Sequence, residues 1–229
     1  MNTNSNTYTI VYATIMVVIV AVLLAFVSQV LSPRQEANVK LDQQKQMLVA
    51  LNQELGADPA AQYDALVLDT LKMDAEGKKA DVIRFNVDGA TKFVYRLHGA
   101  GLWGGIGGYL ALDEDKNTIF GINFNHESET PGLGALIVEE PFRSQFAGKH
   151  IRNAEGEIVS VVVLKKGNTA ENGEEQVDAV SGATITSTGV SDMLKANLDE
   201  YKEFLNQANG QCQGQGQIEK EVENVEPED

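Results

Sequence analysis

The chain has 229 residues, and its formal net charge at pH 7 is −15. This length accommodates one membrane anchor and one domain of ordinary size with its own core. The negative charge argues against a nucleic-acid partner, because it would repel the phosphates. The single cysteine, Cys212, cannot form an internal disulfide or supply the ligand set of an iron–sulfur cluster, so any electron carrier here is organic or haem-like.

The N-terminal region predicts a membrane anchor. No charged side chain occurs before Arg34, and residues 9–31 consist mainly of Ile, Val, Leu, Ala, Met and Phe. A helix over these residues is roughly 35 Å long, which is enough to cross a bilayer core of about 30 Å. A cleaved signal peptide would need a positive n-region, and residues 1–8 carry no Lys or Arg. We therefore predict a short lead over residues 1–8 and a retained transmembrane helix over residues 9–31.

Residues 32–75 predict a polar stalk and a helical segment. A Gln-rich stretch from Pro33 to about Leu55 has a partial apolar stripe of helical spacing. Asp58 and Pro59 begin a second short helix, because proline suits the first helical turn. One face of this second helix would carry Tyr63, Leu66, Val67 and Leu71.

From residue 76 onward the apolar pattern changes to a period of two, which is typical of strands. Asp88-Gly89 separates two such segments and predicts a hairpin. A short helix is expected over residues 139–150, and an amphipathic helix follows Gly189. The predicted strands cover residues 82–87, 91–97, 109–112, 118–124 and 157–164. Together these features predict an α+β fold, with an antiparallel-sheet domain and flanking helices over residues 76–207 and a disordered Gln/Gly-rich, acidic tail over residues 208–229.

A hydroxyl-rich stretch over residues 178–189 precedes the amphipathic helix. Serine and threonine often cap a helix, but a cap needs only one or two of them. The start of a helix also favours an anion such as a phosphate, because backbone N–H groups are unpaired there and the dipole is positive. Both interpretations are open at this point. The hydroxyl residues are Ser181, Thr184, Thr186, Ser187 and Thr188.

The segment Asp178-Ala-Val-Ser-Gly-Ala-Thr184 resembles the Asp-x-x-Ser/Thr-Gly-Ala-Thr acceptor motif of the FMN-binding domains in bacterial respiratory complexes. The resemblance implies that one FMN per chain is esterified through its phosphate to Thr184. A bulky flavin nucleotide needs small residues beside the acceptor, and Gly182 and Ala183 meet this need. The other residues of the implied site around the acceptor are Asp178, Ser181 and Thr186.

Two further segments resemble the same family. Residues 99–108 contain six glycines around the only tryptophan, and the resemblance implies that Leu102 and Trp103 cover the flavin ring. The glycines would let the backbone approach that ring closely, although a mobile glycine loop is the alternative. Residues 126–134 resemble a His-x-x-Glu-Thr-Pro-Gly-Leu-Gly segment that forms a wall of the flavin pocket; alternatively they form a bare turn with a solvated carboxylate. By resemblance, the contacts of this wall come from Glu129, Thr130, Gly132, Leu133 and Gly134.

The remaining candidates for chemistry carry no recognisable pattern. His98, His126 and His150 are dispersed and lack the spacing of a metal site. Ser181 does not lie in a Gly-x-Ser-x-Gly sequence, so it is no candidate nucleophile. We therefore predict neither a metal ligand nor a catalytic residue in this chain.

The whole chain resembles the C-subunit family of Na+-translocating NADH:quinone oxidoreductases. The resemblance implies a flavoprotein of the bacterial inner membrane, with one span and an extracytoplasmic FMN domain. It would carry electrons from NADH towards ubiquinone or menaquinone, inside a complex that exports sodium. The implied partners are the other membrane subunits and, during maturation, a flavin transferase; the chain alone would not be a complete enzyme. The positive charges after the span favour a cytoplasmic domain instead, and they come from Arg34, Lys40 and Lys45.

Two alternatives remain. The equivalent FMN subunit of the ferredoxin:NAD oxidoreductase (Rnf) complex shares both motifs and the anchor, although the Leu-Trp-Gly segment and the long stalk favour the first family. A flavin-free, membrane-tethered binding or assembly module would leave Thr184 unmodified.

Overall fold

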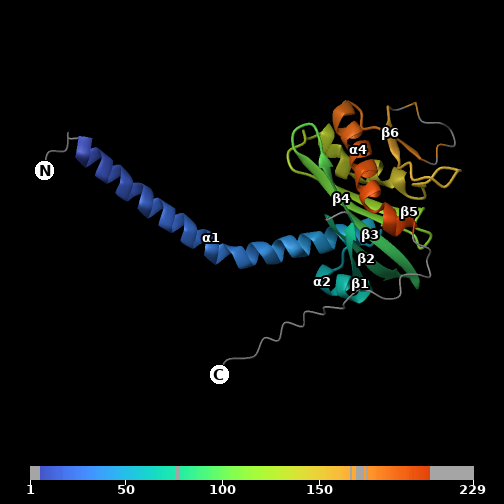
Figure 1. Ribbon diagram of the computed structural model, residues 1–229, viewed down its shortest axis with the longest axis horizontal. Coiled ribbons are helices and arrows are strands. Elements are labelled where there is room, and N and C mark those ends of the chain that lie inside the picture. The colour runs from blue at the N-terminus through green and yellow to red at the C-terminus, as the bar shows by residue number, and fades with distance from the viewer. Residues whose placement is uncertain (1–5, 76–77, 166, 169–172, 174, 207–229) are drawn as a thin grey trace, which may run out of the picture. The chain divides into compact units, whose positions relative to one another are not determined.

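The computed structural model describes residues 6–75, 78–165, 167–168, 173 and 175–206 (Figure 1). The expected tail, residues 208–229, lies outside the described residues. Internal contacts divide the chain into two compact units, Met1–Gln43 and Gln44–Asp229. The boundary between these units falls inside the first helix.

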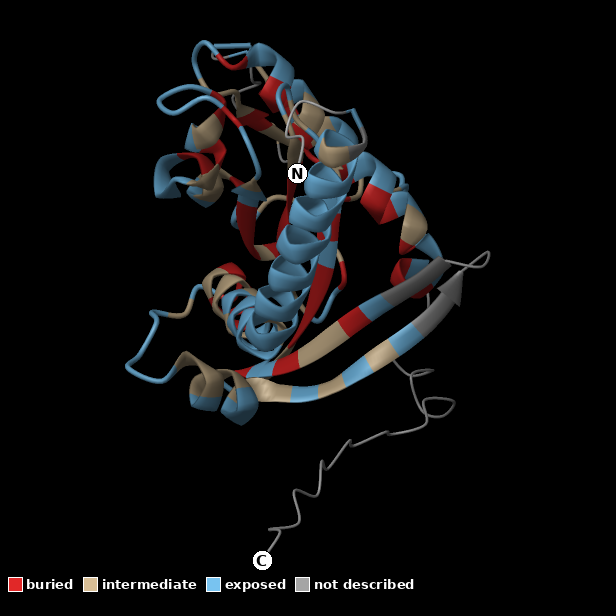
Figure 2. Ribbon diagram, turned by 90° about the vertical axis from the view of Figure 1, so that its left-hand side faces the viewer, coloured by how far each residue is buried: buried red, intermediate tan, exposed pale blue. Residues whose placement is uncertain are grey.

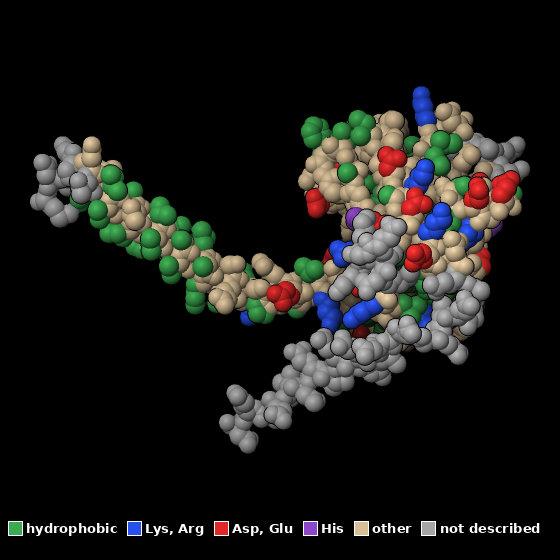
Figure 3. All heavy atoms as spheres, in the orientation of Figure 1, with side chains coloured by type: hydrophobic (Ala, Val, Ile, Leu, Met, Phe, Trp, Pro, Cys, Tyr) green, Lys and Arg blue, Asp and Glu red, His purple; other side chains and the backbone are tan. Residues whose placement is uncertain are grey.

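Helix α1, Asn6–Ala50, contains both the predicted span and most of the predicted stalk. Its N-terminal part is long and apolar enough to cross a membrane, and hydrophobic side chains cover it (Figure 3). Pro33 lies inside this helix rather than at the start of a new one, and it removes one backbone hydrogen bond there.

The C-terminal end of α1 falls at Ala50, five residues before the expected end near Leu55. Asn52 adopts a left-handed conformation with φ of 54°. The N–H of Gln53 then donates to the carbonyl of Leu48 at 2.9 Å, and the N–H of Asn52 donates to Val49 at 3.0 Å. This pair of bonds is a Schellman motif, in which asparagine takes the place that glycine usually occupies.

Helix α2, Pro59–Leu66, begins as predicted, and the Asp58 side chain accepts a hydrogen bond from the N–H of Ala61 at 3.1 Å. The prediction that Val67 and Leu71 continue this helical face is wrong. Both residues lie in strand β1, Val67–Ala75, where Leu71 pairs with Val82. Pairing with a neighbouring strand thus overrides a local spacing that is compatible with a helix.

The centre of the domain is an antiparallel sheet with the strand order β1-β2-β3-β4-β5. The added strands are β2, Lys78–Val87, β3, Ala90–Ala100, β4, Gly105–Leu112, and β5, Ile119–His126. The predicted β2–β3 hairpin is confirmed, and positive φ angles at Asp88 (53°) and Gly89 (82°) identify a type I′ turn. The predicted α+β class is confirmed as well.

The two faces of the sheet carry separate apolar cores, because side chains alternate along each strand. Buried residues, drawn in red in Figure 2, lie in the strands and in the helices packed on them. We call the core that contains the buried residues of helix α4, Thr184–Glu200, the front core, and the one that contains the end of α1 the back core. On β3, for example, Tyr95 belongs to the front core and Val94 to the back core. The back core also contains Met47 and Ala50 from the last turn of α1 and Leu51, the residue that follows it. Residues 44–75, assigned from the sequence to the stalk and helical segment, therefore contribute both to a core and to the sheet.

The front face is covered by helices from the second half of the chain (Figure 1). They are η1, Gly134–Val138, α3, Glu140–Arg143, η2, Ser144–Phe146, α4, Thr184–Glu200, and α5, Lys202–Asn206. The single helix expected over residues 139–150 is thus replaced by two short elements. The side chain of Asn197 on α4 pairs with His98 on β3: it accepts from the backbone N–H at 3.2 Å and donates to the carbonyl at 2.8 Å.

The predicted strand over residues 157–164 is mostly wrong. Only Val162–Leu164 forms a strand, β6, and it pairs in parallel with β7, Gln176–Asp178. Ser160 has a φ of 67°, and the N–H groups of Val159 and Ser160 both donate to the carbonyl of Ile151. A residue in the left-handed region interrupts the extended backbone, whatever the valine content around it. The small parallel sheet also departs from the antiparallel expectation, and it holds the chain immediately before the hydroxyl-rich stretch.

Candidate functional site

Helix α4 begins at Thr184, the last residue of the acceptor-like motif. The turn before it is closed by a hydrogen bond from the N–H of Ala183 to the carbonyl of Val180 at 3.2 Å. Gly182 has a φ of 77°, as the third position of a type II turn requires. The N-cap position is Ala183, whose methyl group cannot accept a hydrogen bond. The interpretation of the hydroxyls as N-caps therefore fails at the N-cap itself, and the first turn can receive an acceptor from outside.

The five hydroxyl residues have different environments. Thr184 and Ser181 are exposed, whereas Thr186 and Ser187 are buried. Thr188 is exposed and donates to the carbonyl of Thr184 at 3.0 Å, inside the helix. The motif therefore presents Thr184 to solvent at the first position of the helix, directly after the turn.

A buried carboxylate connects the three segments that the sequence singled out. Glu129 is 4% exposed. Its Oε1 accepts from the backbone N–H of Trp103 at 2.9 Å, and its Oε2 accepts from the Thr186 hydroxyl at 2.6 Å. A Cβ added at Gly101 or at Gly134 would collide with one of these two oxygens. Glu129 is therefore enclosed by the protein rather than solvated, and a side chain at either glycine would displace its carboxylate.

Burial alone would raise the pKa of the Glu129 carboxyl. Hydrogen bonds from the Thr186 hydroxyl and from the backbone N–H groups of Trp103, Leu102 and Gly104 outweigh this effect, so the pKa lies below its ordinary value. Glu129 is consequently held as a carboxylate that accepts from the loop over residues 101–104 and from helix α4.

The lowered pKa predicts a pH-dependent contribution to stability. A carboxyl whose pKa is lower in the folded than in the unfolded chain stabilises the fold above its unfolded pKa of about 4.3, and loses this contribution as the pH falls through the folded value. We expect wild type to be more stable than Glu129→Gln at neutral pH, and the difference to shrink as the pH falls below the unfolded value of about 4.3. Urea unfolding of both chains across this range measures it. A difference that stays constant or grows towards low pH would contradict the assignment.

The predicted apolar cover of the flavin is exposed. Trp103 is 67%, Leu102 45% and Leu133 42% exposed. Leu133 lies against the turn before α4, because a Cβ at Gly182 would be 2.9 Å from its Cδ2. Exposed large apolar side chains beside a polar helix start are typical of a binding surface. Gly132, with a φ of 75°, lies in the tight loop in which the carbonyl of Thr130 accepts from the N–H groups of Leu133 and Ala135.

The glycines of residues 99–108 have an internal role. Strands β3 and β4 extend into this stretch, so it is not a mobile loop as a whole. A Cβ at Gly99 would be 2.7 Å from the Cβ of Met193, and one at Gly107 would be 2.9 Å from the carbonyl oxygen of Leu97. These glycines accommodate the protein's own atoms, so approach to a ligand ring is not needed to explain them.

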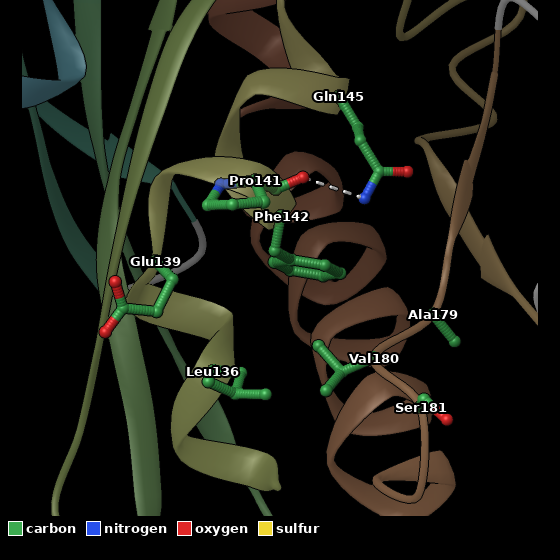
Figure 4. A pocket seen from close by; sticks show the side chains of 8 residues that line it. All are labelled: Leu136, Glu139, Pro141, Phe142, Gln145, Ala179, Val180 and Ser181. Carbon is green, nitrogen blue, oxygen red and sulfur yellow. Dashed lines mark hydrogen bonds between the residues drawn. The ribbon is translucent and has the colours of Figure 1, made fainter. Parts of the chain in front are cut away.

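A pocket of about 410 Å³ lies beside the acceptor-like motif (Figure 4). Gln145, on its wall, accepts from the N–H of Asp178 through Oε1 at 2.9 Å and donates to the carbonyl of Asp178 through Nε2 at 3.4 Å. This side chain therefore pairs with the backbone of Asp178 as a neighbouring strand would, and it positions the start of the acceptor-like motif. The lining residues are Leu136, Glu139, Pro141, Phe142, Gln145, Ala179, Val180 and Ser181.

Sequence reasoning found Ser181 among these residues and missed Gln145 and the apolar wall. No local pattern identifies Gln145, because its contact to Asp178 joins positions 33 residues apart. The structure brings the predicted residues of the loop over residues 101–104, the segment 129–134 and the start of α4 together around Glu129, while Asp178 lies on the other side of the type II turn, at Gln145.

Comparison with known proteins gives consistent results. A model of the FMN-binding domain family matches residues 101–199. The C subunit of the Na(+)-translocating NADH-quinone reductase from Vibrio campbellii is 33% identical over 132 residues, which cover 53% of this chain and 50% of that protein. The corresponding protein from Haemophilus ducreyi is 34% identical over 125 residues, which cover 55% and 48%. The chain thus spans about half the length of the curated relatives that it matches.

Solved structures match a larger part of this chain than the curated relatives do. The crystal structure of the C subunit from Parabacteroides distasonis is 37% identical, with a TM-score of 0.73, and the match covers 78% of this chain and 98% of that one. The crystal structure of Shewanella oneidensis NqrC, at 23% identity and a TM-score of 0.62, shares the fold over 73% of this chain and 98% of that one. Since the match to the first structure extends over nearly all of it, the chain belongs to the family of C subunits of the Na(+)-translocating NADH-quinone reductase.

Proposed function

We propose that this chain is a membrane-anchored flavoprotein subunit that carries electrons through one FMN, attached by a phosphoester to the hydroxyl of Thr184. The observation that carries this proposal is the position of Thr184. It is exposed and is the first residue of a 17-residue helix whose N-cap is an alanine. A phosphate on its Oγ would lie where first-turn N–H groups lack intrahelical acceptors and the helix dipole is positive.

The surroundings of Thr184 fit the rest of a flavin. Leu102, Trp103 and Leu133 expose apolar surface that can cover a flat ring, and Gly132 belongs to a loop that can approach it. Ser181, Gly182 and Ala183 leave the approach to Thr184 free of large side chains. FMN supplies the redox chemistry, while these residues orient it and limit its contact with water.

The names of the relatives indicate the assembly. We propose that the chain works with the other membrane subunits of a Na+-translocating NADH:quinone oxidoreductase, which as a whole oxidises NADH, reduces quinone and exports sodium. The family membership favours this complex over the ferredoxin:NAD oxidoreductase. We further propose that residues 9–31 span the bacterial inner membrane and that the FMN domain, residues 76–207 together with the segment packed on it, lies on the extracytoplasmic face, where a flavin transferase acts.

Mass spectrometry of the full-length chain tests the attachment. Produced in bacteria together with a flavin transferase and then denatured, the chain should gain the mass of one FMN phosphoester and retain flavin fluorescence. The same chain produced without the transferase is the control and should show neither. A transferase that modifies a known acceptor protein but leaves this chain unmodified would overturn the proposal in favour of a flavin-free tethered module.

A further inference from the structure

The loop that carries Trp103 is short and closed. It joins β3 to β4, and the N–H of Gly101 donates to the carbonyl of Gly104 at 2.8 Å. Two carboxylates hold it. Exposed Glu127 accepts from the N–H of Gly105 at 3.1 Å, and buried Glu129 accepts from the N–H of Trp103.

Glu129 also connects this loop to helix α4. Its second oxygen accepts from the Thr186 hydroxyl, and Thr186 lies two residues after Thr184 in the first helical turn. Thr186 is 1% exposed, so its hydroxyl is directed into the protein and not towards a ligand. A Cβ at Gly134 would come within 2.7 Å of the Thr186 Oγ1, so the segment over residues 129–134 packs directly against the same hydrogen bond.

We infer that Glu129 and Thr186 are positioning residues, whose buried hydrogen bond sets the place of the Trp103 loop relative to the flavin attachment residue Thr184. The inference rests on the proposed function, but it differs from a direct role of these two residues as polar contacts of the flavin. Both are enclosed by protein, and each oxygen of the carboxylate already accepts from a protein donor. Their effect on the cofactor would therefore pass through the loop.

The bridge would preorganise the loop whose apolar side chains cover the flavin. Because the bridge is buried and holds the backbone N–H of Trp103, this backbone would keep its place relative to the attachment point before any flavin arrives. Such preorganised surroundings determine how much water reaches a flavin and hence its reduction potential. A loop released from the helix would leave the attachment chemistry intact and alter the environment of the ring.

The test compares Thr186→Val, Glu129→Gln and the double variant in the full-length chain. The matched control is Thr188→Val, the same substitution at an exposed threonine two residues later on α4. Thr186→Val keeps the side-chain shape and removes the hydroxyl. Trp103 is the only tryptophan, so its fluorescence reports this loop alone. In the flavin-free chain we expect Thr186→Val to shift the emission and increase quenching by acrylamide, with unchanged far-ultraviolet circular dichroism, and the control to match wild type.

In the flavin-loaded chain, Thr186→Val should retain full attachment by mass and change the midpoint potential and the visible circular dichroism of the flavin. The double variant should show no further shift beyond the larger single effect, because both changes break one bridge. Reduced thermal stability with an unchanged Trp103 signal and an unchanged potential would overturn the inference and leave a purely structural role. If no chain gains flavin, the proposed function fails, while the Trp103 measurement still decides whether the bridge positions the loop.

Discussion

Replacing Thr184 by alanine is expected to abolish covalent flavin attachment and to leave the fold intact. Without the hydroxyl oxygen no phosphoester can form at this position. The Thr184 side chain is exposed, and alanine is a better helix former than threonine, so the helix should not lose stability. Intact mass after co-production with a flavin transferase measures attachment, and the thermal unfolding midpoint of the same sample reports the fold.

Two matched variants sharpen this experiment. Thr188→Ala removes an exposed hydroxyl one turn later on the same helix and should retain one FMN per chain. Thr184→Ser retains a hydroxyl at the acceptor position and should keep part of the attachment. If Thr184→Ala still carried one FMN while Thr188→Ala did not, the acceptor would be Thr188 and the proposed site would be wrong.

Replacing Gly108 by alanine is expected to lower the free energy of unfolding more than any other substitution proposed for this chain. Gly108 lies in β4 with a φ of 151°, which a side chain rarely adopts. Its added Cβ would collide with the carbonyl oxygen of Asn123 and come within 2.9 Å of the Cα of Phe124, both on β5. These are backbone atoms in the middle of a paired strand, so no side-chain rotation relieves the clash. Conformational strain and overpacking together amount to about 2–5 kcal/mol.

Gly89→Ala separates the two causes. Gly89 also has a positive φ, 82°, but an added Cβ there would meet no atom within 4 Å. Only the strain of about 1–2 kcal/mol should remain. Urea unfolding of the two variants measures the difference. Equal losses in both would mean that β4 and β5 shift apart at little cost and that the close approach is not a constraint.

The sequence was informative where structure is decided locally. The amphipathic pattern after Gly189 correctly predicted a helix with a buried face, because neighbours three and four positions apart share a face whatever they pack against. Asp88-Gly89 located the hairpin for a similar reason. The pattern failed at Leu71 and at Ser160, where strand pairing and a left-handed residue decide the outcome.

The site shows the same division. The acceptor-like motif and Trp103 were found from short patterns, and their roles stay predictions. The contact between Glu129 and Thr186 spans 57 residues and the one between Gln145 and Asp178 spans 33, so neither could be read from local spacing. The buried state of Glu129 was also missed, because a Glu-Thr-Pro-Gly sequence is typical of an exposed turn.

The separation of the two cores has a consequence for the order of assembly during synthesis. The side-chain amide of Asn52 donates a hydrogen bond to the carbonyl of Phe120, and that of Asn125 donates one to the side-chain oxygen of Gln46. The back face of the sheet can therefore be covered once the ribosome has released residue 125. The front requires Asn197 to reach His98, 99 residues earlier in the chain. During synthesis the start of α4 therefore leaves the ribosome after all five strands of the sheet, whose other face can already be covered. A maturation enzyme that requires the folded start of α4 would modify finished domains and pass over nascent ones.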